Sequence, residues 1–226
     1  LVEARDEREE ALVIAMALRE TLEQRHQTAA LVTPDRNLAR RVAAEMRRFG
    51  LEINDSAGQP LRKTTIGDFV RLVVRVGFAA PDPIALISLL KHPLTLLGET
   101  PARARRAANL FELVILRGAI SPPAFGQFAS HVEKVETSME GGTKRIARSV
   151  RRISQRDWKL IHALASRLDS LLLPDLNDDC INGLDQLTTT TIQLLETFGV
   201  DASGELDRLY ATEHGKQIAG FLGDLL

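Results

Sequence analysis

The sequence predicts an α/β fold, in which a small parallel-sheet unit at the N-terminus is followed by a mostly α-helical region. The first observation behind this prediction is the order helix, strand, helix, strand over residues 2–53. The second is the apolar spacing after residue 65, which keeps the helical period almost without interruption. We therefore expect two units, an α/β unit at residues 1–80 and a helical region at residues 81–226.

The strands of the expected sheet are two short apolar segments. Ala29–Thr33 is a run that Pro34 ends, which is typical of a buried strand in a parallel sheet. Leu51–Ile53 alternates apolar and polar residues like a second strand. We expect these two segments to run side by side as interior parallel strands.

Two helices complete the expected α/β unit. Val2–Gln24 has acidic residues crowded into its first half and apolar residues near the helical period. Thr33 is placed to cap a second helix, with Pro34 in its first turn. This helix is expected over Asp35–Phe49, and Gly50 is expected to end it as the C-cap.

The rest of the chain reads as a series of helices. Proline pairs stand where helices should begin, since proline is tolerated in the first turn. No sequence period of solenoid length repeats. The expected helices cover residues 66–77, 83–91, 101–117, 121–133, 143–151, 155–172, 183–198 and 203–213.

Composition and charge bound the function classes. The chain has 226 residues, of which 44% are hydrophobic and 26% charged, which excludes disordered and collagen-like proteins. The 29 lysines and arginines balance 30 acidic residues, so overall charge excludes neither nucleic acid nor protein as a partner. The single cysteine, Cys180, excludes a disulfide framework, a multi-cysteine zinc site and a four-cysteine iron–sulfur cluster within this segment.

The N-terminal sequence bears on location. The opening LVEARDEREE is charged and lacks the apolar core of a signal peptide, so we expect a cytoplasmic protein. Because the chain starts on Leu within a charged helical pattern, we also expect it to be a piece of a longer protein.

Motifs for catalysis are missing from the sequence. The nearest approaches to a phosphate-binding loop, at residues 142–144 and 215–216, lack its spacing and its terminal hydroxyl. No Gly-x-Ser-x-Gly elbow is present for a hydrolase nucleophile. Asp157 and Lys159 imitate half of a nuclease motif, but they fall in a predicted helix, so we interpret Trp158 between them as a core residue.

Metal-binding patterns are equally incomplete. Asp175, Asn177 and Asp179 resemble the start of a calcium loop, but Cys180 and Gln186 replace its required Gly and Glu. The five histidines lie far apart without a nearby cysteine. We therefore expect no catalytic, cofactor-binding or metal-binding residue in this segment.

Two basic sets are the candidate nucleic-acid-binding residues, because arginine and lysine neutralise phosphates. Six cations and no acid lie between Glu140 and Asp157, and helical spacing would place several of them on one face. The alternative interpretation is a solvated helix face balanced by the acidic stretch Asp169–Asp185. With few aromatic residues, 4% of the chain, a stacking platform for single strands is not expected. The candidates are Lys144, Arg145, Arg148, Arg151 and Arg152, followed by Arg103, Arg105 and Arg106.

Most of residues 3–125 resemble a known family. The order from the glutamate-rich opening through AALVTPDRNLARRVAAEMRRFGLEI to TIGDFVRLVV is similar to domain 2A of UvrD/PcrA-type superfamily 1 helicases. The segments DSAGQPL and LISLLKHPLTLLG and the step Leu116-Arg117-Gly118 are similar to the AddB family. AddB proteins are the helicase-like and nuclease subunits of the AddAB double-strand-break repair complexes.

The resemblance implies a place within a larger protein. The α/β unit would correspond to the 2A-like, P-loop-helicase type of fold, and the helical region to the 2B-like insertion. The parent would use ATP and Mg²⁺, carry a 4Fe-4S cluster at its nuclease, and work with an AddA-like helicase subunit on double-stranded DNA ends. This kinship depends on Ala29–Thr33 and Leu51–Ile53 forming the paired strands.

Departures from the helicase pattern argue against motor activity. Active helicases carry Tyr-Arg-x-Asn after the strand, where this chain has Thr33-Pro34-Asp35-Arg36, and EIKD is replaced by Thr65-Ile66-Gly67-Asp68. The resemblance therefore implies an internal, noncatalytic helicase-like segment that positions DNA and docks the partner subunit. The alternative is a purely structural protein–protein interaction module without DNA contact.

Overall fold

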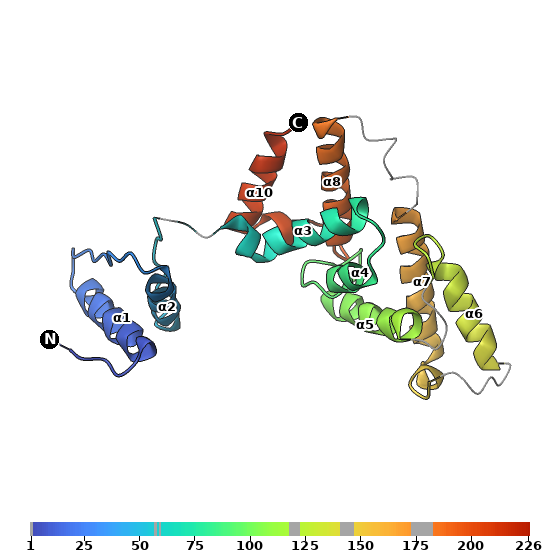
Figure 1. Ribbon diagram of the computed structural model, residues 1–226, viewed down its shortest axis with the longest axis horizontal. Coiled ribbons are helices and arrows are strands. Elements are labelled where there is room, and N and C mark those ends of the chain that lie inside the picture. Colours follow the sequence, from blue (N-terminus) through green and yellow to red (C-terminus); the bar gives the residue numbers. More distant parts are fainter. Residues whose placement is uncertain (1, 57, 59, 118–122, 141–146, 173–182) are drawn as a thin grey trace. The chain divides into compact units, whose positions relative to one another are not determined.

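The computed structural model describes residues 2–56, 58, 60–117, 123–140, 147–172 and 183–226 (Figure 1). Their contacts divide the chain into two compact units, Leu1–Gln59 and Pro60–Leu226. Residues 66–77, which the sequence analysis placed in an N-terminal α/β unit, lie in the second of these units.

The first unit is a pair of helices, α1 over Glu7–Glu23 and α2 over Arg36–Arg48. Asp6 caps α1 by accepting hydrogen bonds from the backbone N–H groups of Arg8 and Glu9. The two helices pack together around a small core. Its fully buried side chains are Ala11, Ala15, Val42 and Met46.

The predicted α/β fold is wrong for the described residues, which form helices and contain no strand. Neither Ala29–Thr33 nor Leu51–Ile53 is a strand. Leu31 lies partly buried against the small helical core, while Val32 is 93% exposed. Backbone in a sheet needs neighbouring strands to pair its N–H and C=O groups, and two segments of this length supply few such pairs.

Leu51 has a different structural reason to be apolar. Gly50 adopts a left-handed φ of 75°. Its N–H donates to the carbonyl of Arg47 at 2.9 Å, and the N–H of Leu51 donates to the carbonyl of Met46 at 3.0 Å. This is a Schellman motif, which commonly brings the second residue beyond the helix against the helix's last turn. The helix stops before Gly50 as predicted, but its C-cap is Phe49, and Gly50 and Leu51 are the two residues that complete the capping motif.

The start of α2 differs from the prediction. Asp35, rather than Thr33, is the N-cap, and its carboxylate accepts a hydrogen bond from the N–H of Asn37 at 2.7 Å. Thr33 acts one step earlier, because its hydroxyl accepts from the N–H of Asp35 at 3.1 Å. Pro34 therefore precedes the helix instead of occupying its first turn.

The second unit is helical throughout its described part. Its first elements are η1 (Leu61–Lys63), α3 (Thr65–Phe78), α4 (Pro83–Leu90), α5 (Pro101–Phe111) and the π-helical η2 (Glu112–Leu116). They continue with α6 (Phe128–Glu140), η3 (Val150–Arg152), α7 (Gln155–Leu171), α8 (Leu184–Gly199), α9 (Asp207–Tyr210) and α10 (Glu213–Gly223).

Most of the helix predictions for this unit are confirmed. The predictions at 66–77, 83–91, 155–172 and 183–198 match α3, α4, α7 and α8 closely, and α5 together with η2 matches the prediction at 101–117. The helix expected at 203–213 is wrong, because a turn and the short α9 precede α10 there. Parts of the helices expected at 121–133 and 143–151 lie outside the described residues; α6 begins at Phe128, and residues 147–152 form a turn followed by η3.

One apolar core joins the helices of the second unit. In that core, α3 packs on α4, α8 and α10, while α7 packs on α5 and α6 (Figure 1). The largest buried side chains include Phe69, Phe111, Phe128, Phe198, Ile161 and Leu168. Because α7 contacts helices on two sides, it fixes α5 and α6 within the same core.

Candidate nucleic-acid interface

Helix α5 carries the first basic set on its exposed side. Pro101 begins the helix, and Ala107, Ala108 and Phe111 are buried against the core. The helix contains no acidic residue. Its cations are exposed at Arg103, Arg105 and Arg106.

Arg106 joins α5 to the first turn of α7. Its Nε donates to Asp157 Oδ1 at 2.6 Å, and one Nη donates to Asp157 Oδ2 at 2.7 Å. The Ser154 hydroxyl, which also caps α7, donates to the same Oδ2 at 2.7 Å. A bidentate charge-assisted pair of this kind fixes both position and orientation.

The environment of Asp157 keeps its carboxyl ionised. The Arg106 guanidinium and the Ser154 hydroxyl hold the pKa of the Asp157 carboxyl well below its usual range. The Asp157 side chain is 9% exposed, whereas that of Arg106 is 62% exposed. The acid is therefore enclosed at the helix junction, while part of the arginine remains on the surface.

The second basic set leads into α7. Arg148 lies in the turn before η3, Arg151 and Arg152 lie in η3, and Arg156 lies in the first turn of α7. All four are exposed, and the buried side chain of Val150 anchors η3 to the core. Asp157 is the only acid of the sequence between residues 147 and 168.

The structure brings part of the two predicted sets together. Arg106, from the α5 set, holds the acid that directly follows the second set in the sequence. Lys144 and Arg145 lie outside the described residues. The single helical face expected for the second set is wrong in its described part, because residues 147–152 form a turn and a short 3-10 helix.

Pairing with acids distinguishes these cations. Arg103 pairs with Glu99, its Nε lying 2.6 Å from the carboxylate. Within the described part of the chain, Arg105, Arg148, Arg152 and Arg156 form no ion pair or side-chain hydrogen bond. Such unneutralised guanidinium groups remain available to phosphate oxygens.

Three residues of this region were missed as site residues. Arg156 belongs to the run of cations without an acid between Glu140 and Asp157, so it could have been chosen from the sequence. Lys159 lies three residues further on, a spacing that places it beside Arg156 on the α7 surface. Asp157 was interpreted only as an imitation of a nuclease motif, and its partner lies 51 residues away in the sequence. We call the set Arg103, Arg105, Arg106, Arg148, Arg151, Arg152, Arg156 and Lys159 the α5–α7 basic surface.

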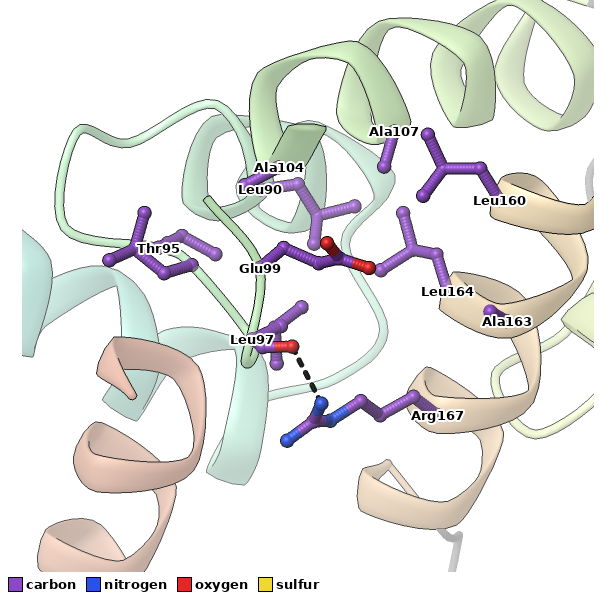
Figure 2. Close-up of a pocket in the computed structure, with 11 residues that line it drawn as sticks. Leu90, Thr95, Leu97, Glu99, Ala104, Ala107, Leu160, Ala163, Leu164 and Arg167 are labelled. Carbon is purple, nitrogen blue, oxygen red and sulfur yellow. Dashed lines mark hydrogen bonds between the residues drawn. The ribbon is translucent and has the colours of Figure 1, made fainter. Parts of the chain in front are cut away.

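An apolar pocket of about 120 Å³ lies elsewhere along the contact between α5 and α7 (Figure 2). Ala104 and Ala107 present only methyl groups to this contact, and they leave space that larger side chains would fill. The other walls are mainly leucines, among them Leu90, Leu160 and Leu164. The pocket has no aromatic wall on which a nucleobase could stack.

The loop between α4 and α5 forms the edge of this pocket. Leu97 and Gly98 both have left-handed backbone, with φ of 50° and 73°. The Arg167 guanidinium donates to the carbonyl of Leu97 at 2.6 Å, as Figure 2 shows. On the other side of the loop, the N–H groups of Leu96 and Leu97 donate to the carbonyl of Phe198. These bonds hold the loop in one shape.

Other chemistry is sparse in the part of the chain that the structure describes. It contains no cluster of three His, Cys, Asp or Glu side chains that could hold a metal ion. Among the same residues, no helix combines the length and apolar character needed to cross a membrane. The calcium-like sequence at 175–179 and Cys180 lie outside the described residues.

Comparisons of the chain with family models, with curated proteins and with solved structures find no match in any of the three.

Proposed function

We propose that this chain is an internal, noncatalytic segment of a helicase-like and nuclease subunit that acts in DNA double-strand-break repair. Its role is to position DNA and to dock an AddA-like partner subunit. The observation that carries the DNA role is the α5–α7 basic surface, in which an acid-free helix is joined through Arg106 and Asp157 to a second run of arginines.

The family part of the proposal is supported by the ordered sequence matches. The longest AddB-like segment, LISLLKHPLTLLG, spans Leu86–Gly98, which is the end of α4 and the loop beside the pocket. Ala29–Thr33 and Leu51–Ile53 are not strands, so the resemblance to a helicase 2A domain no longer supports the proposal, and the support comes from the AddB-like segments alone. Nuclease and ATP-dependent helicase activity, Mg²⁺, the 4Fe-4S cluster and the cytoplasmic location belong to the proposed parent protein.

The DNA role is tested by the salt dependence of binding. Each phosphate contact that is lost lowers the slope of log affinity against log salt by about 0.9 for duplex DNA. Replacing Lys144, Arg145, Arg148, Arg151 and Arg152 with Ala should weaken duplex binding by the complete chain and flatten this slope. Unchanged affinity and slope would remove the DNA role. A matched control replaces five other exposed arginines, Arg5, Arg8, Arg25, Arg47 and Arg208, and should keep most of the slope.

The alternative function is a structural protein–protein interaction module without DNA contact. The pocket beside α5 favours it, because its leucine and alanine walls suit an aliphatic side chain of a partner, while Thr95, Glu99 and Arg167 form the polar part of its lining. Binding to an AddA-like subunit that is unaffected by replacing Lys144 and the four arginines, together with no DNA binding by the chain, would favour this alternative.

A further inference from the structure

We infer that the α5–α7 basic surface binds the backbone of double-helical nucleic acid as one unit, with Asp157 as the positioning residue that holds its two halves together. This inference rests on the proposed function and deepens it. It treats all members of this surface, Arg156 and Lys159 included, as one binding unit, and it assigns a binding role to an acid that touches no DNA itself.

Cations gather at an end of α7 where the helix itself disfavours positive charge. The N-terminal end of a helix carries partial positive charge, so cations there are unfavourable. Arg151, Arg152 and Arg156 nevertheless gather at the start of α7. Ser154 caps this end by accepting from the N–H of Asp157, and the Arg152 and Arg156 side chains beside it form no ion pair within the described residues. The arrangement costs folding stability and concentrates positive potential at one place.

The cations of the basic surface lie on separate elements, which one pair of hydrogen bonds connects. Helix α5 carries Arg103, Arg105 and Arg106, whereas α7 carries Arg156 and Lys159. The Arg106–Asp157 pair bonds the two helices directly at the basic end of α7. Fixed spacing between the halves allows both to meet phosphates of one rigid backbone without further ordering, which favours affinity.

The aromatic residues near the basic surface indicate which form of nucleic acid it fits. Trp158 and Phe111, the aromatic residues of α7 and α5, are buried, with 6% and 0% exposure. Binding of single strands usually uses exposed aromatic side chains on which bases stack. Phosphate contacts remain, and duplex DNA has the denser row of phosphates. The surface therefore fits a duplex backbone without reading the bases.

Asp157→Asn is a test in which the loss of negative charge and the loss of the positioning contact predict opposite changes in DNA affinity. The substitution removes a negative charge, so simple electrostatics predicts tighter DNA binding. It also weakens the bidentate pair, so the positioning role predicts weaker binding. We expect the complete chain carrying Asp157→Asn to bind a 20-base-pair duplex about threefold to tenfold more weakly, by fluorescence anisotropy at fixed salt.

The matched control is Asp68→Asn. Asp68 pairs with Arg71 within α3, so this variant removes the same charge without touching the α5–α7 contact. Its affinity should equal or slightly exceed that of the unmodified chain. Binding by Asp157→Asn that is as tight as binding by Asp68→Asn would overturn the positioning role.

A second variant keeps the net charge and is checked for its fold, so that weaker binding is not mistaken for a folding defect. Arg106→Lys retains a cation but loses the planar fork that bonds both carboxylate oxygens. It should also weaken duplex binding, while circular dichroism and the fluorescence of Trp158, the single tryptophan, show that the fold is retained. Unchanged affinity in this folded variant would contradict the inference.

Single-stranded DNA of the same length separates the inference from the proposed function. We expect the unmodified chain to prefer the duplex, and to bind A·T-rich and G·C-rich duplexes equally. Equal or tighter binding of the single strand would overturn the duplex assignment and leave the proposed DNA role intact. No binding of either form would overturn both.

Discussion

The carboxylate of Asp169, in the last turns of α7, caps the beginning of α6. Its two oxygens accept hydrogen bonds from the backbone N–H groups of Phe128 and Ala129, each at 2.8 Å. These residues lie about forty positions from Asp169 in the sequence, so the cap is also a tertiary contact. It ties the start of one helix to the end of the helix on which it packs.

Asp169→Ala should therefore destabilise the second unit. The variant leaves the N–H groups at the start of α6 without their acceptor, and loss of a cap costs about 1–2 kcal/mol. Asp169→Asn keeps one oxygen acceptor and should lose less. Urea unfolding measures the loss in free energy of unfolding for both variants. Equal stability of the Ala variant and the unmodified chain would show that the cap contributes nothing to stability.

Acid should weaken the contact between α5 and α7. Because Arg106 and Ser154 lower the pKa of Asp157 in the folded chain, this carboxyl stabilises the fold at pH values above the unfolded pKa of about 3.9. That contribution is lost as pH falls from this value through the lower folded pKa. The free energy of unfolding, measured at a series of pH values, should fall more steeply below about pH 4 for the unmodified chain than for Asp157→Asn. Parallel curves would contradict this account.

Alkali should act through Tyr210. Burial, followed by the charge and hydrogen bond of Glu196, raises the pKa of Tyr210 to about 12. The unfolded side chain ionises near pH 10, so the stability that the neutral phenol contributes is present below about pH 10 and is lost as pH rises through the folded pKa. Tyr210 is the single tyrosine, so ultraviolet absorbance follows its ionisation directly. Tyr210→Phe should lose less stability over this range, and a native titration midpoint near 10 would contradict the burial effect.

Gly50→Ala should destabilise the first unit through backbone strain. A Cβ at this position meets no atom within 4 Å, so the left-handed φ of 75° is the sole source of cost. We expect a loss of about 1 kcal/mol in the free energy of unfolding. Gly220→Ala is the control, since this glycine lies in α10 with open space around it and without positive φ. The control should gain stability, whereas a gain at Gly50 would contradict the strain argument.

Most helices of the second unit could be predicted from the sequence, whereas the two predicted strands were wrong. Prolines and caps mark where α3, α4 and α7 begin, and these signals are local. A short apolar segment carries no such signal. The run at Ala29–Thr33 has alternating exposure along an irregular segment, and Leu51 is apolar because it packs at a helix cap. Periodicity alone does not separate these cases from a strand.

The candidate site was predictable only as a set of charges. Arg148, Arg151 and Arg152 stand out because no acid lies among them, and Arg103, Arg105 and Arg106 share one helix. The bond between Arg106 and Asp157 was not predictable, because it depends on how α5 packs on α7. Sequence spacing also assumed a regular helix through residues 147–152, where the chain turns instead.

The two hydrophobic cores described above have a thermodynamic consequence. The core of Leu1–Gln59 has four fully buried side chains, whereas the core of Pro60–Leu226 draws on helices along its whole length. A chain whose apolar clusters are separate need not melt in a single transition. Calorimetry should resolve an early, small heat absorption from the helical pair and a later, larger one from the remainder, and each substitution should move only the peak of its own unit.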